Sequence, residues 1–258
     1  MAFVHASVGV LALATFLTGV SADLKTCSRN NSLSCHSSSQ TGTCCYNYPG
    51  GALLQTQFWD TDPSTGPSDS WTIHGLWPDN CDGTYESNCD ESRAYTNITD
   101  ILEGQNRTDL LDYMKEYWVD IDGKSETFWA HEWGKHGTCV NTIKPNCYTN
   151  YSPQEEVGEF FQKTVDLFKG LDTYQALSAA GITPDESKTY TSNEIISALS
   201  DHHGAKVYID CTSGKLNQVW YFFNVRGNAI NGQYQPTDTL ADNSKCPSRG
   251  IKYLPKSN

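Results

Sequence analysis

Residues 71–79 read WTIHGLWPD, and residues 128–139 read FWAHEWGKHGTC. In the first segment, alternation up to His74 predicts a strand, and Pro78 is expected to end it, which leaves His74 near the end of the strand. The second segment is interpreted as a helix that carries two histidines, a glutamate and a lysine among large aromatic residues. Titratable groups in a rigid apolar frame are typical of the wall of a cleft.

The geometry of the second segment follows from the turn of about 100° per residue in a helix. Counted from His131, the other three ionisable groups fall within roughly 140° in the order Lys135, Glu132 and His136. Trp133 points away from them into the core. A charged helical face is usually only solvated, and a lone histidine on a strand is more often structural than catalytic. The aromatic frame favours a cleft wall here.

A metal site is the second interpretation of this segment, because His131 and Glu132 resemble the start of the zinc motif HExxH. That motif needs its second histidine four residues after the first, where this chain has Lys135. A fixed ammonium group repels a divalent cation, and His136 lies further round the helix. We therefore expect no metal and no other cofactor.

The remaining sequence predicts a single α+β domain. It has neither internal repeats nor Pro/Gly-rich linkers, and its strand-like and helix-like runs alternate irregularly. Strand-like runs cover 52–58, 71–76, 206–211 and 216–226, and helix-like runs cover 110–118, 152–170 and 191–204. In the last helix, Thr191 and Glu194 form a capping box, and Gly204 is expected to end it.

Residues 1–22 have the features of a secretory signal peptide. They lack Lys, Arg, Asp and Glu, the apolar run from Val8 to Val20 is short for a membrane span, and small residues precede Asp23. We expect cleavage after Ala22, a mature catalytic domain over 23–258, and no association with a membrane.

The ten cysteines also indicate export through the secretory pathway, because all of them lie in residues 23–258 and their number is even. In an oxidising compartment they predict five disulfides. Cys44 and Cys45 are neighbours and should reach different partners, since a bond between them would be strained. Three sequons predict surface glycans at Asn30, Asn97 and Asn106.

The formal charge is −12 at pH 7, so bulk electrostatics do not attract a polyanion at neutral pH. At about pH 5 most histidines gain a proton, and repulsion of a polyanion weakens. An enzyme that acts on nucleic acid should therefore have an acidic pH optimum.

The segment from His74 to Pro78, together with residues 128–139, resembles the two active-site segments of the ribonuclease T2 family, the secreted acid transphosphorylating ribonucleases. The cysteine layout resembles the fungal branch of that family. The resemblance implies a central antiparallel sheet packed against helices. It also implies the disulfide pairs Cys27–Cys45, Cys35–Cys81, Cys44–Cys147, Cys89–Cys139 and Cys211–Cys246.

The resemblance further implies that single-stranded RNA is cleaved to a 2′,3′-cyclic phosphate, which water then opens to a 3′-phosphate. His136 would be the base and His74 the acid. Lys135 and Glu132 would stabilise the transition state, and His131 would hold the phosphate. Because the nucleophile is the substrate's own 2′-hydroxyl, no metal is required and DNA should not be cut.

Base binding is also implied by the resemblance. The principal base site maps onto Trp77, Asp79 and Tyr85, with the base between the two rings and the carboxyl on an exocyclic amine. A second base site would use Gln57 and Phe128, although the chain departs from the fungal pattern nearby, at residues 119–120.

The alternative is a catalytically silent secreted relative that binds RNA or a cell surface. Such a protein would keep the aromatic residues and disulfides and lose a histidine, whereas His74 and His136 are both present. We expect a monomer that is secreted or delivered to a vacuole or another acidic compartment.

Overall fold

The computed structural model describes residues 23–37 and 42–257, so the predicted signal peptide lies outside the described residues. The main element is a five-stranded antiparallel sheet in the order β3–β2–β6–β5, with β7 also paired to β6. Its strands are β2 (Ala52–Phe58), β3 (Thr72–Asp79), β5 (Tyr208–Thr212), β6 (Lys215–Arg226) and β7 (Gln233–Thr237). A separate short ladder joins β1 (Asp23–Leu24) to β4 (Tyr148–Thr149).

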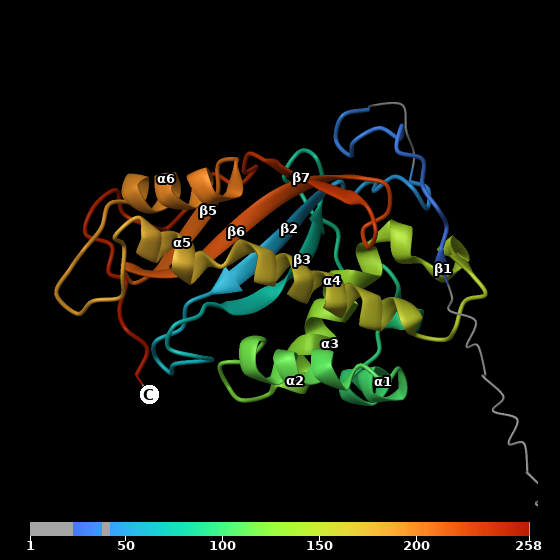
Figure 1. The fold of residues 1–258 in the computed structure, drawn as a ribbon, viewed down its shortest axis with the longest axis horizontal. Helices are drawn as coiled ribbons and strands as arrows, with labels where there is room; N and C mark the ends of the chain where they lie inside the picture. The colour runs from blue at the N-terminus through green and yellow to red at the C-terminus, as the bar shows by residue number, and fades with distance from the viewer. Residues whose placement is uncertain (1–22, 38–41, 258) are drawn as a thin grey trace, which may run out of the picture.

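The helices are α1 (Ile98–Gly104), α2 (Thr108–Tyr117), α3 (Ser125–Lys135), α4 (Glu155–Leu171), α5 (Thr173–Ala179) and α6 (Ser192–His203). Helix α4 crosses the sheet in front of β2 and β3, while α1, α2 and α3 lie together below it (Figure 1). The capping box predicted for α6 is present, and Gly204 ends that helix with a φ of 88°. Among the described residues, no helix combines the length and apolarity needed to cross a bilayer.

The two faces of the sheet have different surroundings. One face supplies Leu53, Ile73 and Tyr221 to the main core, where they pack with residues of the helices such as Phe161. The other face carries a smaller cluster around Leu54, Tyr208 and Phe222, against which Trp77 and Trp220 pack. Helices therefore bury one face of the sheet, and an aromatic surface is left on the other.

The predicted strands are found with small shifts in their ends, and β7 is an addition. The expectation that Pro78 would end its strand is wrong, because β3 continues to Asp79 and Pro78 pairs with Leu53. β3 is the edge strand of the sheet, where a residue without an N–H group can be accommodated without loss of a ladder hydrogen bond.

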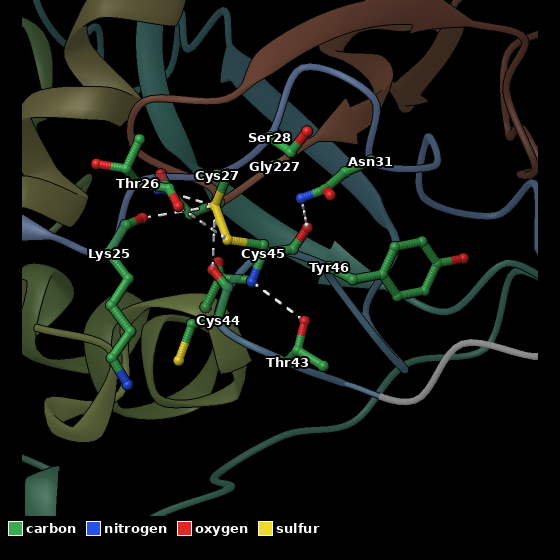
Figure 2. Close-up of a disulfide and its surroundings, with 12 residues drawn as sticks. Lys25, Thr26, Cys27, Ser28, Asn31, Thr43, Cys44, Cys45, Tyr46 and Gly227 are labelled. Carbon is green, nitrogen blue, oxygen red and sulfur yellow. Dashed lines mark hydrogen bonds between the residues drawn. A yellow bond between two sulfur atoms is a disulfide. The ribbon is translucent and has the colours of Figure 1, made fainter.

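All five disulfides implied by the resemblance are formed, and no cysteine is free. Figure 2 shows Cys45 joined to Cys27, while the sulfur of the neighbouring Cys44 points elsewhere and is bonded to Cys147. The adjacent cysteines therefore connect one segment to two others. At about 2–4 kcal/mol each, these bonds contribute substantially to the stability of the fold.

Candidate active site

A β-bulge sets the direction of the His74 side chain. Along β2 and β3, Thr56 pairs with Gly75 and the next residue pairs with Ile73, so His74 is the extra residue of the bulge. In a regular strand, residues three apart point to opposite faces, and a bulge reverses that relation. His74 and Trp77 therefore share the aromatic face of the sheet, whereas Ile73 and Leu76 share the core face.

His136 is held where helix α3 ends. It is the C-cap residue, and its backbone N–H still donates to the carbonyl of Glu132, at 3.1 Å. Gly137 follows it and packs on the indole of Trp133 so closely that a Cβ atom there would lie 2.4 Å from the ring. The prediction that Trp133 points into the core is confirmed, since its side chain is fully buried.

His74 and His136 line the same pocket, which has a volume of about 470 Å³. The indole of Trp77 contacts both imidazoles. It stacks on His136 at 4.9 Å between ring centroids and meets His74 edge-on at 4.6 Å. On another side His74 stacks on Phe58 at 3.9 Å. Two segments about sixty residues apart in the chain are thus joined through one aromatic ring.

Glu132 lies behind these rings and is buried. Its Oε2 accepts a hydrogen bond from Trp77 Nε1 at 2.8 Å, and its Oε1 lies 3.7 Å from His74 Nε2. Gly75 provides the space, because a Cβ atom at that position would lie 2.0 Å from Glu132 Oε2. Glycine at position 75 is thus required by the close approach of strand and carboxylate.

Burial dominates the electrostatics of the site. It lowers the pKa of His74 to about 3 and that of His136 to about 2, with a further contribution from the charge of Lys135. Burial also raises the pKa of Glu132 to about 8 and that of Asp79 to about 7. Burial therefore disfavours charge on these groups, and an anion bound among them would favour protonated imidazoles.

Several polar atoms of the site have no protein partner. Among residues 23–37 and 42–257, neither ring nitrogen of His136 has a hydrogen-bond partner, nor has Nδ1 of His74 or Oε1 of Glu132. Buried polar atoms are normally paired, so the unpaired ring nitrogens of the two histidines that line the pocket indicate a ligand-binding site.

Comparisons with known proteins agree with this geometry. The profile described as the Ribonuclease T2 family matches residues 50–246 of the chain. The chain belongs to the ribonuclease T2 family. It is 59% identical over 254 residues to Ribonuclease T2 of Aspergillus oryzae. This match covers 97% of this chain and 92% of the Aspergillus protein. The chain is 60% identical over 238 residues to Ribonuclease M of Aspergillus phoenicis, covering 91% and 99% respectively.

Solved structures of T2 ribonucleases confirm the predicted fold. The crystal structure of Actibind, a T2 ribonuclease, is similar at a TM-score of 0.89 and 60% identity, covering 92% of this chain and all of that one. Human RNase T2 matches at a TM-score of 0.60 and 26% identity, over 80% of this chain and 99% of that one. The single α+β domain with an antiparallel sheet and five disulfides is thus confirmed.

The three residues that the ribonuclease T2 resemblance assigns to the principal base site all line the pocket. Asp79 forms an isolated β-bridge with Tyr85, a pocket residue that is 61% exposed. The ammonium of Lys135, which also lines the pocket, lies 6.0 Å from the centre of that ring.

Four other predicted site residues are not among those that line the pocket: Glu132, which is buried behind the rings of His74 and Trp77, and Gln57, Phe128 and His131. Gln57 is buried inside the protein, where it donates to Gln55 and accepts from Thr173. Phe128 is half-buried, with its ring centroid 5.8 Å from that of His74. His131 is exposed on α3, so the four ionisable groups of the helix divide between surface and interior.

The sequence reasoning did not predict that residues of β5 and β6 also line the pocket. Gln218, Trp220 and Phe222 alternate along β6 and therefore face the pocket together. That alternation is visible in the sequence, and it is the signal that could have identified these residues. Gln218 also hydrogen-bonds to the imidazole of His74, which opposes the lowering of the His74 pKa.

Proposed function

We propose that this protein cleaves single-stranded RNA by transphosphorylation, with His74 and His136 as the proton donor and acceptor. That the chain is a ribonuclease T2-type endoribonuclease is supported by relatives of 59% and 60% identity that are named ribonucleases. The proposal adds the mechanism and the residues. The observation that carries it is the placement of both imidazoles, with unpaired ring nitrogens, in one pocket.

In the first step, His136 takes the proton of the ribose 2′-hydroxyl, whose oxygen forms a new bond to phosphorus. The bond from phosphorus to the 5′-oxygen breaks, and that oxygen takes a proton from His74. The products are a 2′,3′-cyclic phosphate and a free 5′-hydroxyl. In the second step the roles reverse, since His74 takes a proton from water and His136 protonates the 2′-oxygen as the ring opens.

The charge that develops on the phosphorane oxygens is stabilised by Lys135 and Glu132. Because the pKa of Glu132 is raised to about 8, its carboxyl group holds a proton at acidic pH and can donate a hydrogen bond. His131 lies on the exposed side of the same helix and would contact the phosphate from there. None of these roles requires a metal or another cofactor.

The base on the 5′ side of the cleaved bond would bind at Trp77, Asp79 and Tyr85. Stacking on the two rings provides affinity, and the Asp79 carboxyl accepts from an exocyclic amine of the base. Phe128 remains a candidate for the second base site. The internal hydrogen bonds of Gln57 give no support to its part in that site.

The function is tested by incubating the mature protein with poly(A) and with single-stranded DNA at about pH 5 in EDTA. We expect cyclic-phosphate intermediates from poly(A) and no cleavage of DNA. His74→Phe and His136→Phe should each abolish cleavage. His202→Gln should keep it, because the His202 ring hydrogen-bonds to the Leu171 carbonyl and does not line the pocket.

Other results would contradict the proposal. Turnover retained in both phenylalanine variants would refute the assigned roles. RNA binding without any product would identify a silent relative, and loss of activity in EDTA would indicate a metal-dependent hydrolase.

We also propose that the chain is exported, cleaved after Ala22, glycosylated and monomeric. Asn30, Asn97 and Asn106 are all exposed. N-terminal sequencing of protein from culture medium should begin at Asp23, and endoglycosidase treatment should lower its mass. Retention of protein in a vacuolar fraction would place it in an acidic compartment instead.

A further inference from the structure

The catalytic pocket extends beyond the histidines and the proposed base site. Its far side lies over β5 and β6 and over the segment that follows β7. We call this part the β5–β6 lobe, and it is lined by Tyr208, Asp210, Trp220, Asn243 and Lys245. A pocket of about 470 Å³ is in the size range of sites for drug-sized ligands, so it has room for more than a single base.

The floor of the lobe is aromatic. Tyr208 and Trp220 are a registered cross-strand pair, and their ring centroids are 4.4 Å apart. Trp220 is half-buried and also meets Trp77 edge-on at 5.4 Å, so the aromatic surface runs without a break from the catalytic residues into the lobe. The indole N–H already donates to Gln218, which leaves the ring itself as the binding element. Such surfaces bind nucleobases by stacking.

The rim of the lobe is polar and carries a cation. The Lys245 side chain is 79% exposed, and its ammonium lies 4.0 Å from the carboxylate of Asp210. Asn243 is exposed beside it. A lysine in such a position can contact a phosphate, and the amide and carboxylate can bond the edge of a base.

The rim is fixed in place before any ligand binds. The disulfide Cys211–Cys246 ties the segment to β5. The Lys245 backbone N–H donates to Asp210 at 2.7 Å, and the Ser244 hydroxyl donates to the Ile209 carbonyl at 2.6 Å. A preorganised rim reduces the entropy lost on binding, as expected of a binding site.

Electrostatics also favour a phosphate in this region. In a chain with a net charge of −12, the pocket is lined by two lysines, Lys135 beside the catalytic histidines and Lys245 in the lobe. A strand that follows the pocket would thus meet one lysine beside the catalytic histidines and a second in the lobe, where the nearby Asp210 offsets part of the positive charge.

We propose that the β5–β6 lobe is a third nucleotide subsite, which binds a nucleotide of the RNA strand beyond the two that flank the cleaved phosphodiester. Its base stacks on Trp220 and Tyr208, and its phosphate contacts Lys245. This inference rests on the proposed function, since it extends the same pocket along the same substrate.

The test compares kcat/KM for ApA, ApApA and ApApApA. For the unaltered enzyme, we expect a rise of roughly tenfold from the dinucleotide to the longer substrates, as stacking of one more base provides. Lys245→Ala and Asn243→Ala should remove most of that gain. They should leave kcat/KM for ApA unaffected, because ApA does not reach the lobe. Lys245→Ala should also reduce the salt dependence of KM for ApApApA, because one phosphate contact is lost.

The matched control is Lys188→Ala, another exposed lysine beside an aspartate, 3.7 Å from Asp185 and outside the pocket. This substitution should leave kcat/KM unchanged for all three substrates. The inference is overturned if kcat/KM of the unaltered enzyme does not rise with substrate length. It is also overturned if Lys245→Ala lowers kcat/KM for ApA as much as for ApApApA. The second result would assign the lobe to the principal base site. Failure of the unaltered enzyme to cleave ApA and poly(A) would instead refute the proposed function.

Discussion

Gly75 has no side chain, and this absence makes room for the carboxylate of Glu132 beside strand β3. Gly75→Ala would drive a methyl group against Glu132 Oε2 and displace either the carboxylate or strand β3. We expect a loss of kcat of about a hundredfold or more, because a misplacement of about 1 Å in a catalytic group has that effect. Steady-state kinetics measure the loss.

The control for this prediction is Gly104→Ala at the end of α1, where an added Cβ has no heavy atom within 4 Å. It should keep activity and stability, since alanine is favoured over glycine in a helix. Equal activity of the two variants would show that the contact at Gly75 has no importance for catalysis.

The carboxyl group of Asp79 provides one physical reason to expect an acidic pH optimum. Burial raises its pKa to about 7, so the carboxyl ionises between about pH 6 and 8 and then repels the RNA phosphate. In the unaltered enzyme, KM for RNA should rise from about pH 5 to pH 8. In Asp79→Asn that rise should be smaller, because the amide stays neutral.

Asp82 provides the matched control, since it lies in the next turn and its hydrogen bonds to Thr84 keep its pKa below the usual range. Asp82→Asn should therefore change KM by the same factor at both pH values. A KM that is independent of pH in the unaltered enzyme would contradict the argument.

At the level of elements, the end of α3 depends on a buried arginine. Arg93 donates through Nη2 to the Thr138 carbonyl at 2.9 Å and through Nε to Asp90 at 2.8 Å. Its own carbonyl accepts from the indole of Trp133. Arg93 thus holds the chain on both sides of His136.

Two substitutions separate the structural and positional effects of Arg93. Arg93→Met should destabilise the fold by about 3–5 kcal/mol, because buried Glu156 loses its cation. Arg93→Lys keeps the charge without the planar fork, so we expect a folded enzyme whose kcat falls about tenfold while KM changes little. Denaturant unfolding and kinetics, with Arg226→Lys as the control, measure these effects. Normal kcat in Arg93→Lys would exclude a positioning role.

Local signals predicted the elements well, and pairing between elements decided what they missed. The capping box of α6 and the alternation of β6 depend on near neighbours in the chain, so the sequence contains them. The bulge at His74 depends on the register against β2, which no local pattern contains. The α3 helix was predicted, but its burial against the sheet, which hides Glu132 and leaves His131 exposed, depends on tertiary packing.

Over the whole molecule, the buried site should place maximum stability on the acidic side of neutrality. Glu132 and Asp79 have raised pKa values, so between about pH 4.5 and 8 the folded state holds protons that the unfolded chain has released, and stability falls as pH rises. His74 and His136 have lowered pKa values, so below about pH 6.5 the unfolded chain binds protons that the folded state does not, and stability falls as pH decreases.

The two trends together predict a maximum in the unfolding temperature near about pH 5–6, with a decline towards pH 8. Glu132→Gln should flatten the decline on the alkaline side, because its amide oxygen can still accept from Trp77 and it cannot ionise. Thermal unfolding followed by circular dichroism across this range measures both curves. If the unaltered protein became steadily more stable up to pH 8, ionisation of Glu132 would have no cost in the folded state, and its proposed role as a proton-bearing donor to the phosphorane would fail with it.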